Sequence, residues 1–97
     1  MYGTIARMHI RPGADQEFQR QLRAYESLNV PGFVSTSMYR TDADPTVFYM
    51  VVAFESKDAY WANARSPEQD ARFKEMRALL ASDPEWHDGE IVGSVTQ

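Results

Sequence analysis

The sequence contains no cysteine among its 97 residues. This absence excludes disulfide bonds, thiolate nucleophiles and sulfur-ligated metals. The chain also lacks an apolar run of the roughly 18–20 residues that a membrane span needs, so we expect no membrane partner. Its basic residues are scattered and its formal net charge is −4. Because phosphate binding needs a basic face, we expect no nucleic-acid partner either.

Two further patterns are missing. The five glycines stand singly, so the chain has no glycine-rich loop that could cradle a phosphate. Ser35, Ser37 and Ser94 have no nearby His and acid that would make one of them a nucleophile. The N-terminus lacks the charged region and apolar block of a secretory signal, so a cytoplasmic location is the expectation.

What is present suits a small globular protein. We expect residues 1–97 to form one domain. The composition, 43% hydrophobic and 25% charged, is ordinary for such a domain. A chain of this length buries only about 60–65% of its unfolded surface. A partner subunit would therefore help to stabilise it.

Alternating apolar residues and turn residues predict four strands. The first covers residues 2–10, with Tyr2 to Ile10 on one face at every second position. The second and third, over 33–40 and 46–55, form a hairpin whose turn holds Asp and Pro. The fourth covers 85–95.

Helical spacing of apolar residues predicts the helices between these strands. One helix covers residues 14–28 and a short one covers 57–64. Ser56 suits the N-cap of the short helix. Ser66 followed by Pro67 starts the last helix, which stops at Ser82-Asp83-Pro84 and whose buried stripe is Phe73, Met76 and Leu80.

The resulting order, β-α-β-β-α-β, predicts an α+β ferredoxin-like fold with a four-stranded antiparallel sheet. The helices cover one face of such a sheet. The strand over 46–55 is nevertheless apolar at both odd and even positions, and a sheet with two apolar faces needs both covered. We therefore expect a homodimer in which a second copy covers the open face of the sheet.

Four segments resemble the antibiotic biosynthesis monooxygenase family, whose members are small dimeric α/β barrels. They are Pro-Gly-Phe at 31–33, the turn at 42–45, the strand–helix junction at 54–60 and the link at 63–67. The family includes cofactor-free monooxygenases that oxidise phenolic polycyclic substrates to quinones. It also includes haem-degrading enzymes and members without known activity.

The resemblance carries over residue by residue. Tyr60 matches a Tyr early in the short helix, and Tyr39 matches a polar residue of the second strand that reaches the pocket. Met50 and Phe54 stand where the quinone-forming members have an Asn and a Trp. Their last-helix Arg is replaced near Phe73.

The haem-degrading branch fits less well. It needs a His in the last helix, and there is none between residues 66 and 82. Its first-strand Asn falls at Ala6. We therefore do not expect haem degradation.

These residues define the expected site, in the space between sheet and helices. We expect Tyr60 and Asn63 to be catalytic. The expected substrate-binding residues are Tyr39, Met50, Phe54 and Phe73. A flat ligand usually binds in such a mostly apolar space. The alternative is that the aromatic residues simply fill the core.

Other chemical candidates have simpler interpretations. The two histidines, His9 on the open face and His87, are too few for a metal site, so no metal is expected. The carboxylates at 42, 44, 85, 88 and 90 fall at turn or solvated positions, which predicts no acidic residue facing the pocket. Trp61 follows Tyr60 directly and is expected on another face of the helix.

The sequence leads to two functional hypotheses. The first is a cofactor-independent monooxygenase-like enzyme acting on a small aromatic or phenolic substrate of the anthrone or quinol type. In that chemistry the deprotonated substrate reduces oxygen itself, and the protein binds it and stabilises its anion. The alternative is a non-catalytic dimeric module that binds a small hydrophobic ligand or serves as a scaffold.

Overall fold

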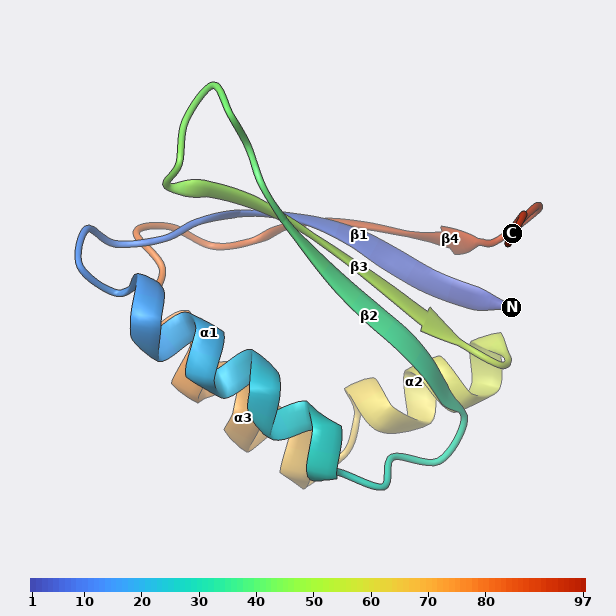
Figure 1. Cartoon of the computed structure of the whole chain (residues 1–97). Helices are drawn as coiled ribbons and strands as arrows, with labels where there is room; N and C mark the ends of the chain where they lie inside the picture. The colour runs from blue at the N-terminus through green and yellow to red at the C-terminus, as the bar shows by residue number, and fades with distance from the viewer.

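The computed structural model describes all 97 residues, and its elements follow the predicted order (Figure 1). The strands are β1 (Tyr2–His9), β2 (Phe33–Arg40), β3 (Val47–Phe54) and β4 (Glu85–Glu90). The helices are α1 (Asp15–Ala24), a 3-10 turn (Tyr25–Ser27), α2 (Lys57–Ala64) and α3 (Pro67–Arg77). None of these helices has the length and apolar character needed to cross a bilayer.

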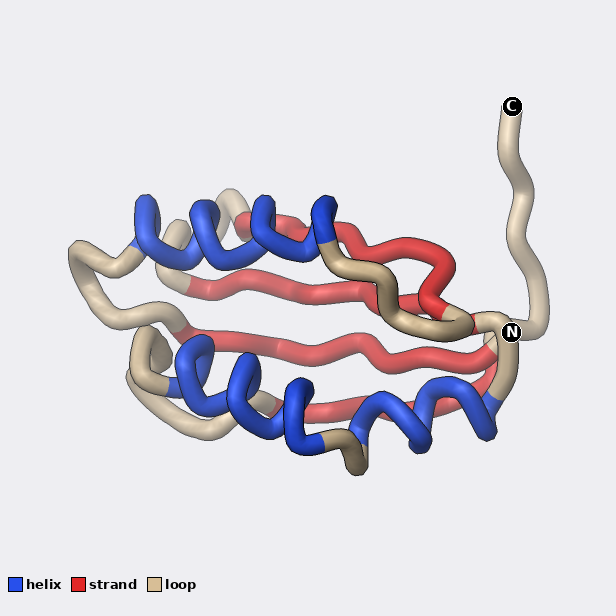
Figure 2. The backbone as a smooth tube through the Cα atoms, turned by 90° about the horizontal axis from the view of Figure 1, so that it is seen from below, coloured by secondary structure: helices blue, strands red, loops and turns tan.

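The four strands form one antiparallel sheet in the order β2-β3-β1-β4. This arrangement confirms the α+β ferredoxin-like fold and the hairpin of β2 and β3. All helices lie on one side of the sheet (Figure 2). In that view α1 crosses the β2–β3 half, and α2 and α3 cross the β1–β4 half. The opposite face of the sheet has no cover within the chain.

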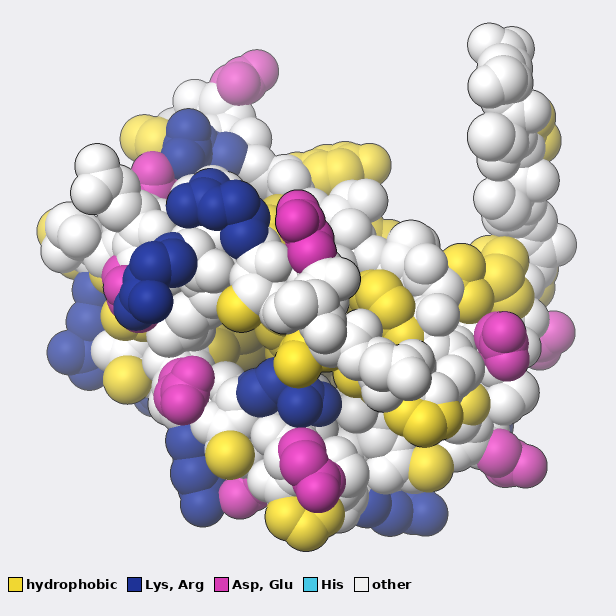
Figure 3. Space-filling view, turned by 60° about the horizontal axis from the view of Figure 1, so that its bottom comes forward, with side chains coloured by type: hydrophobic (Ala, Val, Ile, Leu, Met, Phe, Trp, Pro, Cys, Tyr) yellow, Lys and Arg dark blue, Asp and Glu magenta, His cyan; other side chains and the backbone are white.

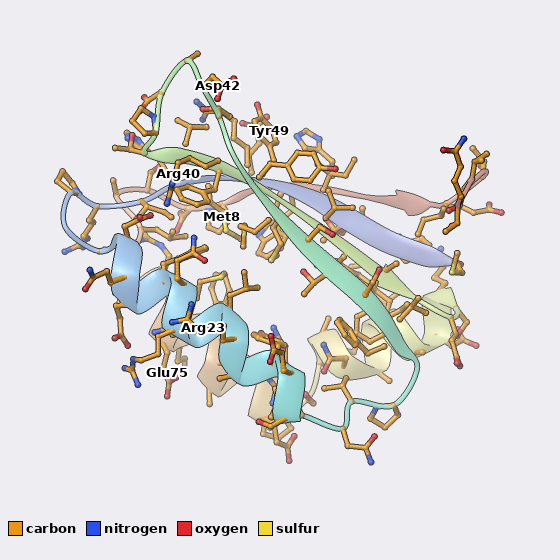
Figure 4. The ribbon with its side chains drawn as sticks, viewed as in Figure 1. Met8, Arg23, Arg40, Asp42, Tyr49 and Glu75 are labelled. Carbon is orange, nitrogen blue, oxygen red and sulfur yellow. The ribbon has the colours of Figure 1, made fainter.

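Side chains alternate between the two faces as the sequence predicts. On β1, Thr4, Ala6 and Met8 are buried, whereas Ile5 is 49% exposed. Figure 4 shows Met8 on the helix side of the sheet and Tyr49 on the opposite side. The two faces of the sheet therefore have different roles, one covered by the helices and one open.

The core fills only one end of the space between sheet and helices. Its buried members are Ala6, Met8, Ile10, Phe18, Phe48 and Leu80. Phe18 on α1 and Phe48 on β3 hold the layers together there, with ring centroids 5.5 Å apart. Towards the other end of β1, the side chains do not close the space.

Both predicted helix starts are confirmed. The Ser56 Oγ accepts a hydrogen bond from the Ala59 N–H at 3.1 Å. The Ser66 Oγ accepts from the Gln69 N–H at 3.1 Å, and Pro67 occupies the first turn of α3. These caps satisfy backbone donors that have no partner within their helices.

The last strand is shorter than predicted, since β4 ends at Glu90 and not at residue 95. Its neighbour β1 begins at Tyr2, and the pairing stops with the Ile91 N–H donating to the Met1 carbonyl at 2.9 Å. The residues that follow extend away from the sheet (Figure 2), with Val92 and Val95 93% and 91% exposed. The prediction was wrong because the pairing of β4 with β1 ends at Glu90, opposite Tyr2.

Two helix predictions also change in detail. The first helix ends at Ala24, and a 3-10 turn replaces its expected last turn. Leu80 is fully buried as expected but lies beyond the end of α3, where it forms an isolated bridge with Ile10.

Candidate active site

A cavity of about 690 Å³ lies between the sheet and the helices. Most of its lining is apolar and comes from every layer of the fold, including Phe18, Leu22, Met38, Met50, Val52, Phe54, Phe73, Met76 and Trp86. In Figure 3, hydrophobic side chains reach the surface between the charged side chains of the helical face. A volume of several hundred Å³ with apolar walls suits a small ligand.

Tyr60 on α2 stands at the centre of an aromatic cluster in this cavity. Its ring meets those of Tyr2, Phe54 and Trp61 edge to face, with centroids 5.2, 5.6 and 5.1 Å away. Such edge-to-face contacts are favourable because the positive edge of one ring meets the negative face of another. Three neighbouring rings therefore hold the Tyr60 ring in one position.

The Tyr60 hydroxyl donates a hydrogen bond to Asp88 Oδ1 on β4, at 2.8 Å. Burial raises the pKa of Tyr60 well above its ordinary value, and the bond to the negative Asp88 raises it further. The Thr4 hydroxyl opposes this shift slightly, although its geometry falls short of a hydrogen bond. Tyr60 is therefore a neutral donor across the physiological pH range.

The cavity has one positive charge. Gln69, Arg72, Phe73 and Met76 share the helical spacing that turns one side of α3 towards the cavity. Arg72 is the only Lys, Arg or His in the lining. Its Nη2 donates to Asn63 Oδ1 at 3.4 Å, a long hydrogen bond, and its Nε donates to Gln69 Oε1 at 3.1 Å.

Two hydroxyl groups in the lining lack partners. The Oγ1 atoms of Thr4 and Thr36 are both buried and make no hydrogen bond within the chain. A buried hydroxyl without a partner costs free energy. A polar atom of a ligand in the cavity would satisfy either one.

Comparison with known proteins assigns the chain to a family. The family model for antibiotic biosynthesis monooxygenases matches residues 1–78. The chain belongs to the antibiotic biosynthesis monooxygenase family. No curated protein matches it in sequence.

Several solved structures have a similar fold. A mutant of SnoaB, a cofactor-independent oxygenase from Streptomyces nogalater, is 17% identical with a TM-score of 0.82, over 99% of this chain and 97% of that one. A conserved protein from Methanosarcina mazei Go1 is 18% identical with a TM-score of 0.78, over 91% and 89%. At such identities the likeness concerns the fold alone.

In this member of the antibiotic biosynthesis monooxygenase family, five of the six expected site residues line the cavity. They are Met50, Phe54, Tyr60, Asn63 and Phe73. The expectation for Tyr39 is wrong. It pairs with Tyr49 on the open face and is 62% exposed, while its neighbour Met38 faces the cavity. The alternation of β2 excludes both residues from facing the same side.

Two expectations, one about the last helix and one about the last strand, are also wrong. Arg72 lines the cavity, so an Arg is present one position before Phe73. Asp88 faces the cavity, although no acidic residue was expected there. Its place follows from its register opposite Thr4, a β1 residue that the sequence already placed on the inner face. The same alternation brings Trp86 to the cavity.

Trp61 lies in the cavity as well, together with Tyr60. The expectation that it faces elsewhere is wrong because successive helical residues are only about 100° apart. A helix that borders a wide cavity therefore turns several consecutive side chains towards it.

Outside this cavity, we find no other group of side chains arranged as a catalytic or metal site. A second hollow of about 330 Å³ includes Arg11 and Arg40. The Arg40 guanidinium is already paired there with Asp15 at 2.7 Å. No three His, Asp or Glu side chains come together in a way that could hold a metal ion.

Proposed function

We propose that this protein is a cofactor-independent monooxygenase-like enzyme acting on a small aromatic or phenolic substrate of the anthrone or quinol type. The observation that carries the proposal is the combination of a neutral donor, Tyr60, and a single cation, Arg72, in one apolar cavity of about 690 Å³. The family and the cofactor-independent oxygenase of similar fold support it.

In the proposed reaction, a methylene group of the substrate and O₂ become a carbonyl group and water. Removal of a proton leaves an electron-rich anion that reduces oxygen itself. As the charge develops, the Tyr60 hydroxyl turns its hydrogen bond from Asp88 to the oxyanion. Arg72, beside its partner Asn63, provides positive charge. A fixed donor and a charge in an apolar site stabilise an anion more than water does. Phe54, Met50 and Phe73 hold the rings.

Oxygen uptake by the pure protein tests this proposal. We expect saturable uptake with one or more of a panel of anthrones and dihydroxyaromatics, and none with heat-denatured protein. Tyr60→Phe removes the donor and should lower kcat by about 10²-fold or more. Tyr39→Phe is the matched control, since the same change outside the cavity should leave the rate unchanged. Equal rates for wild type and Tyr60→Phe would remove Tyr60 from the mechanism.

A second function is a ligand-binding module without catalysis. One observation favours it: β3 presents Met50 and Phe54 to the cavity where the quinone-forming members carry polar or indole groups. The open volume argues against a pure scaffold, whose side chains would fill the space. Saturable binding of an aromatic ligand without oxygen uptake would favour this function.

We further propose that two copies associate through the open face of the sheet. Ile5 and Tyr39 are exposed on that face at 49% and 62%, and Tyr49 and Val51 of β3 lie between them. Contiguous apolar residues on an open sheet are typical of an interaction surface. Sheet-to-sheet packing of two copies would form the dimeric α/β barrel.

A further inference from the structure

Thr4 and Asp88 stand directly opposite each other on β1 and β4. Side chains of directly opposed residues in an antiparallel pair have Cβ atoms only about 5 Å apart. Both line the cavity, and the Tyr60 hydroxyl meets Asp88 Oδ1 from α2 at 2.8 Å. Three oxygen atoms from three elements therefore gather at one place in the cavity wall.

The hydrogen-bonding capacity of this group is incomplete. Thr4 is only 5% exposed, and its hydroxyl has no partner in the chain. An ionised carboxylate accepts several hydrogen bonds, and the one from Tyr60 is the only side-chain bond that Asp88 makes. A ligand oxygen that accepts from Thr4 and donates to Asp88 would satisfy both residues.

We propose that Thr4 and Asp88 together bind a neutral hydroxyl group of the ligand, and that Asp88 is the proton acceptor of the site. A phenol meets both requirements because its oxygen accepts from Thr4 and its hydrogen donates to Asp88. A phenolate lacks the hydrogen and would face the Asp88 charge. This inference rests on the proposed function in one respect, namely that the cavity takes a phenolic ligand.

The proton step is simple. The O–H bond of the ligand breaks, its electron pair stays on the ligand oxygen as a phenolate, and a new O–H bond forms on the Asp88 carboxyl. Tyr60, whose proton is firmly held, then donates to the new oxyanion. Asp88 is exposed on the rim of the cavity, so its proton can leave to solvent water.

The test uses two probes that differ by one group. The neutral and anionic forms of 4-nitrophenol absorb at different wavelengths, so its ionisation can be read while it is bound. 4-Nitroanisole has a methyl group in place of the hydroxyl hydrogen. We expect the wild-type protein to bind 4-nitrophenol at least about tenfold more tightly than 4-nitroanisole, and to raise the pKa of the bound phenol.

Two variants address the proposed pair. Asp88→Asn replaces the acceptor by an amide that donates, so it should shift the ionisation of bound 4-nitrophenol about tenfold towards the anion and abolish the preference over 4-nitroanisole. Thr4→Val keeps the shape and should weaken binding of 4-nitrophenol severalfold. Glu90→Gln is the matched control, since it removes the same charge from the same strand and should change neither quantity.

The outcomes separate this inference from the proposed function. If 4-nitrophenol binds to wild type and Asp88→Asn alters neither its affinity nor its ionisation, Asp88 is not the acceptor. Failure of the folded protein to bind the probe would overturn both the inference and the phenolic substrate. If wild type prefers 4-nitrophenol to 4-nitroanisole as expected, but takes up no oxygen with any anthrone, the hydroxyl-binding site is supported and the oxygenase function is refuted.

Discussion

The Tyr60 hydroxyl should ionise only at a pH well above the ordinary pKa of a tyrosine. Burial and the bond to Asp88 raise its pKa above the ordinary 10.0, so the folded protein keeps this proton while the unfolded chain loses it. The stabilising effect is complete below about pH 10 and is lost as the pH rises above that value. Tyrosinate absorbance of the folded protein should show one delayed step, and that step should be missing in Tyr60→Phe.

Comparison with Tyr39 sharpens this measurement. Tyr39 is exposed on the open face and makes no contact with the cavity, so Tyr39→Phe should leave the delayed step intact. If the delayed step disappeared in Tyr39→Phe and remained in Tyr60→Phe, the assignment of that step to Tyr60 would be wrong.

Gly3 shows how closely β1 and β3 approach each other. A Cβ atom at this position would lie 1.7 Å from the carbonyl oxygen of Val52, a backbone atom that cannot move without breaking the strand pairing. We expect Gly3→Ala to lower the free energy of unfolding by about 3 kcal/mol or more, at or beyond the upper end of ordinary overpacking. Urea denaturation measures this change.

Gly89 provides the control, because it is paired with Gly3 on β4 and nothing lies within 4 Å of its Cβ position. Gly89→Ala should change the free energy of unfolding by less than about 0.5 kcal/mol. Similar losses in the two variants would show that crowding is not the reason for Gly3.

Among the elements, α3 depends on the residue that caps its start. Ser66 caps the Gln69 N–H, and the helix makes the part of the cavity wall that carries Arg72. Ser66→Ala should cost about 1 kcal/mol of stability and weaken ligand binding. Ser94→Ala, in the extended C-terminal segment, should change neither. Equal midpoints of urea unfolding for Ser66→Ala and wild type would contradict the capping role.

The elements that the sequence predicts well are those with local signals. Ser56 and Ser66 mark helix starts within four residues, and the turn at 42–45 defines the β2–β3 hairpin. The end of β4 has no such signal. It depends on where β1 begins, at Tyr2 near the other end of the chain, and so the local sequence could not predict it.

The site was predicted less completely than the fold for a similar reason. Tyr60 and Phe54 follow from the strand–helix junction that contains them. Asp88 and Trp86 become visible only when β4 is placed in register with β1. Tyr39 was misplaced because an exposed tyrosine on the open face and a cavity-lining one differ by a single position along the strand.

At the scale of the whole molecule, the proposed dimer depends on the open face of the sheet. Ile5→Asp places a charge among its apolar residues and should convert the proposed dimer to a monomer, because an unpaired buried charge is strongly unfavourable. Sedimentation velocity measures the change. Ala71→Asp adds the same charge on an exposed position of α3 and should leave the dimer intact. A monomeric wild type would refute the proposed dimer outright.

The strand β4 is exposed along its whole length, and the chain fastens it through β1, the Tyr60–Asp88 bond and the contact of Trp86 with Phe73. Such an edge strand opens more readily than the core. A ligand that binds Thr4 and Asp88 at once ties β4 to β1 by an additional link. Amide hydrogens of residues 85–90 should therefore exchange with deuterium more slowly when the cavity is occupied, and the slowing should be lost in Asp88→Asn. Hydrogen exchange of this edge strand therefore reports whether the cavity is occupied.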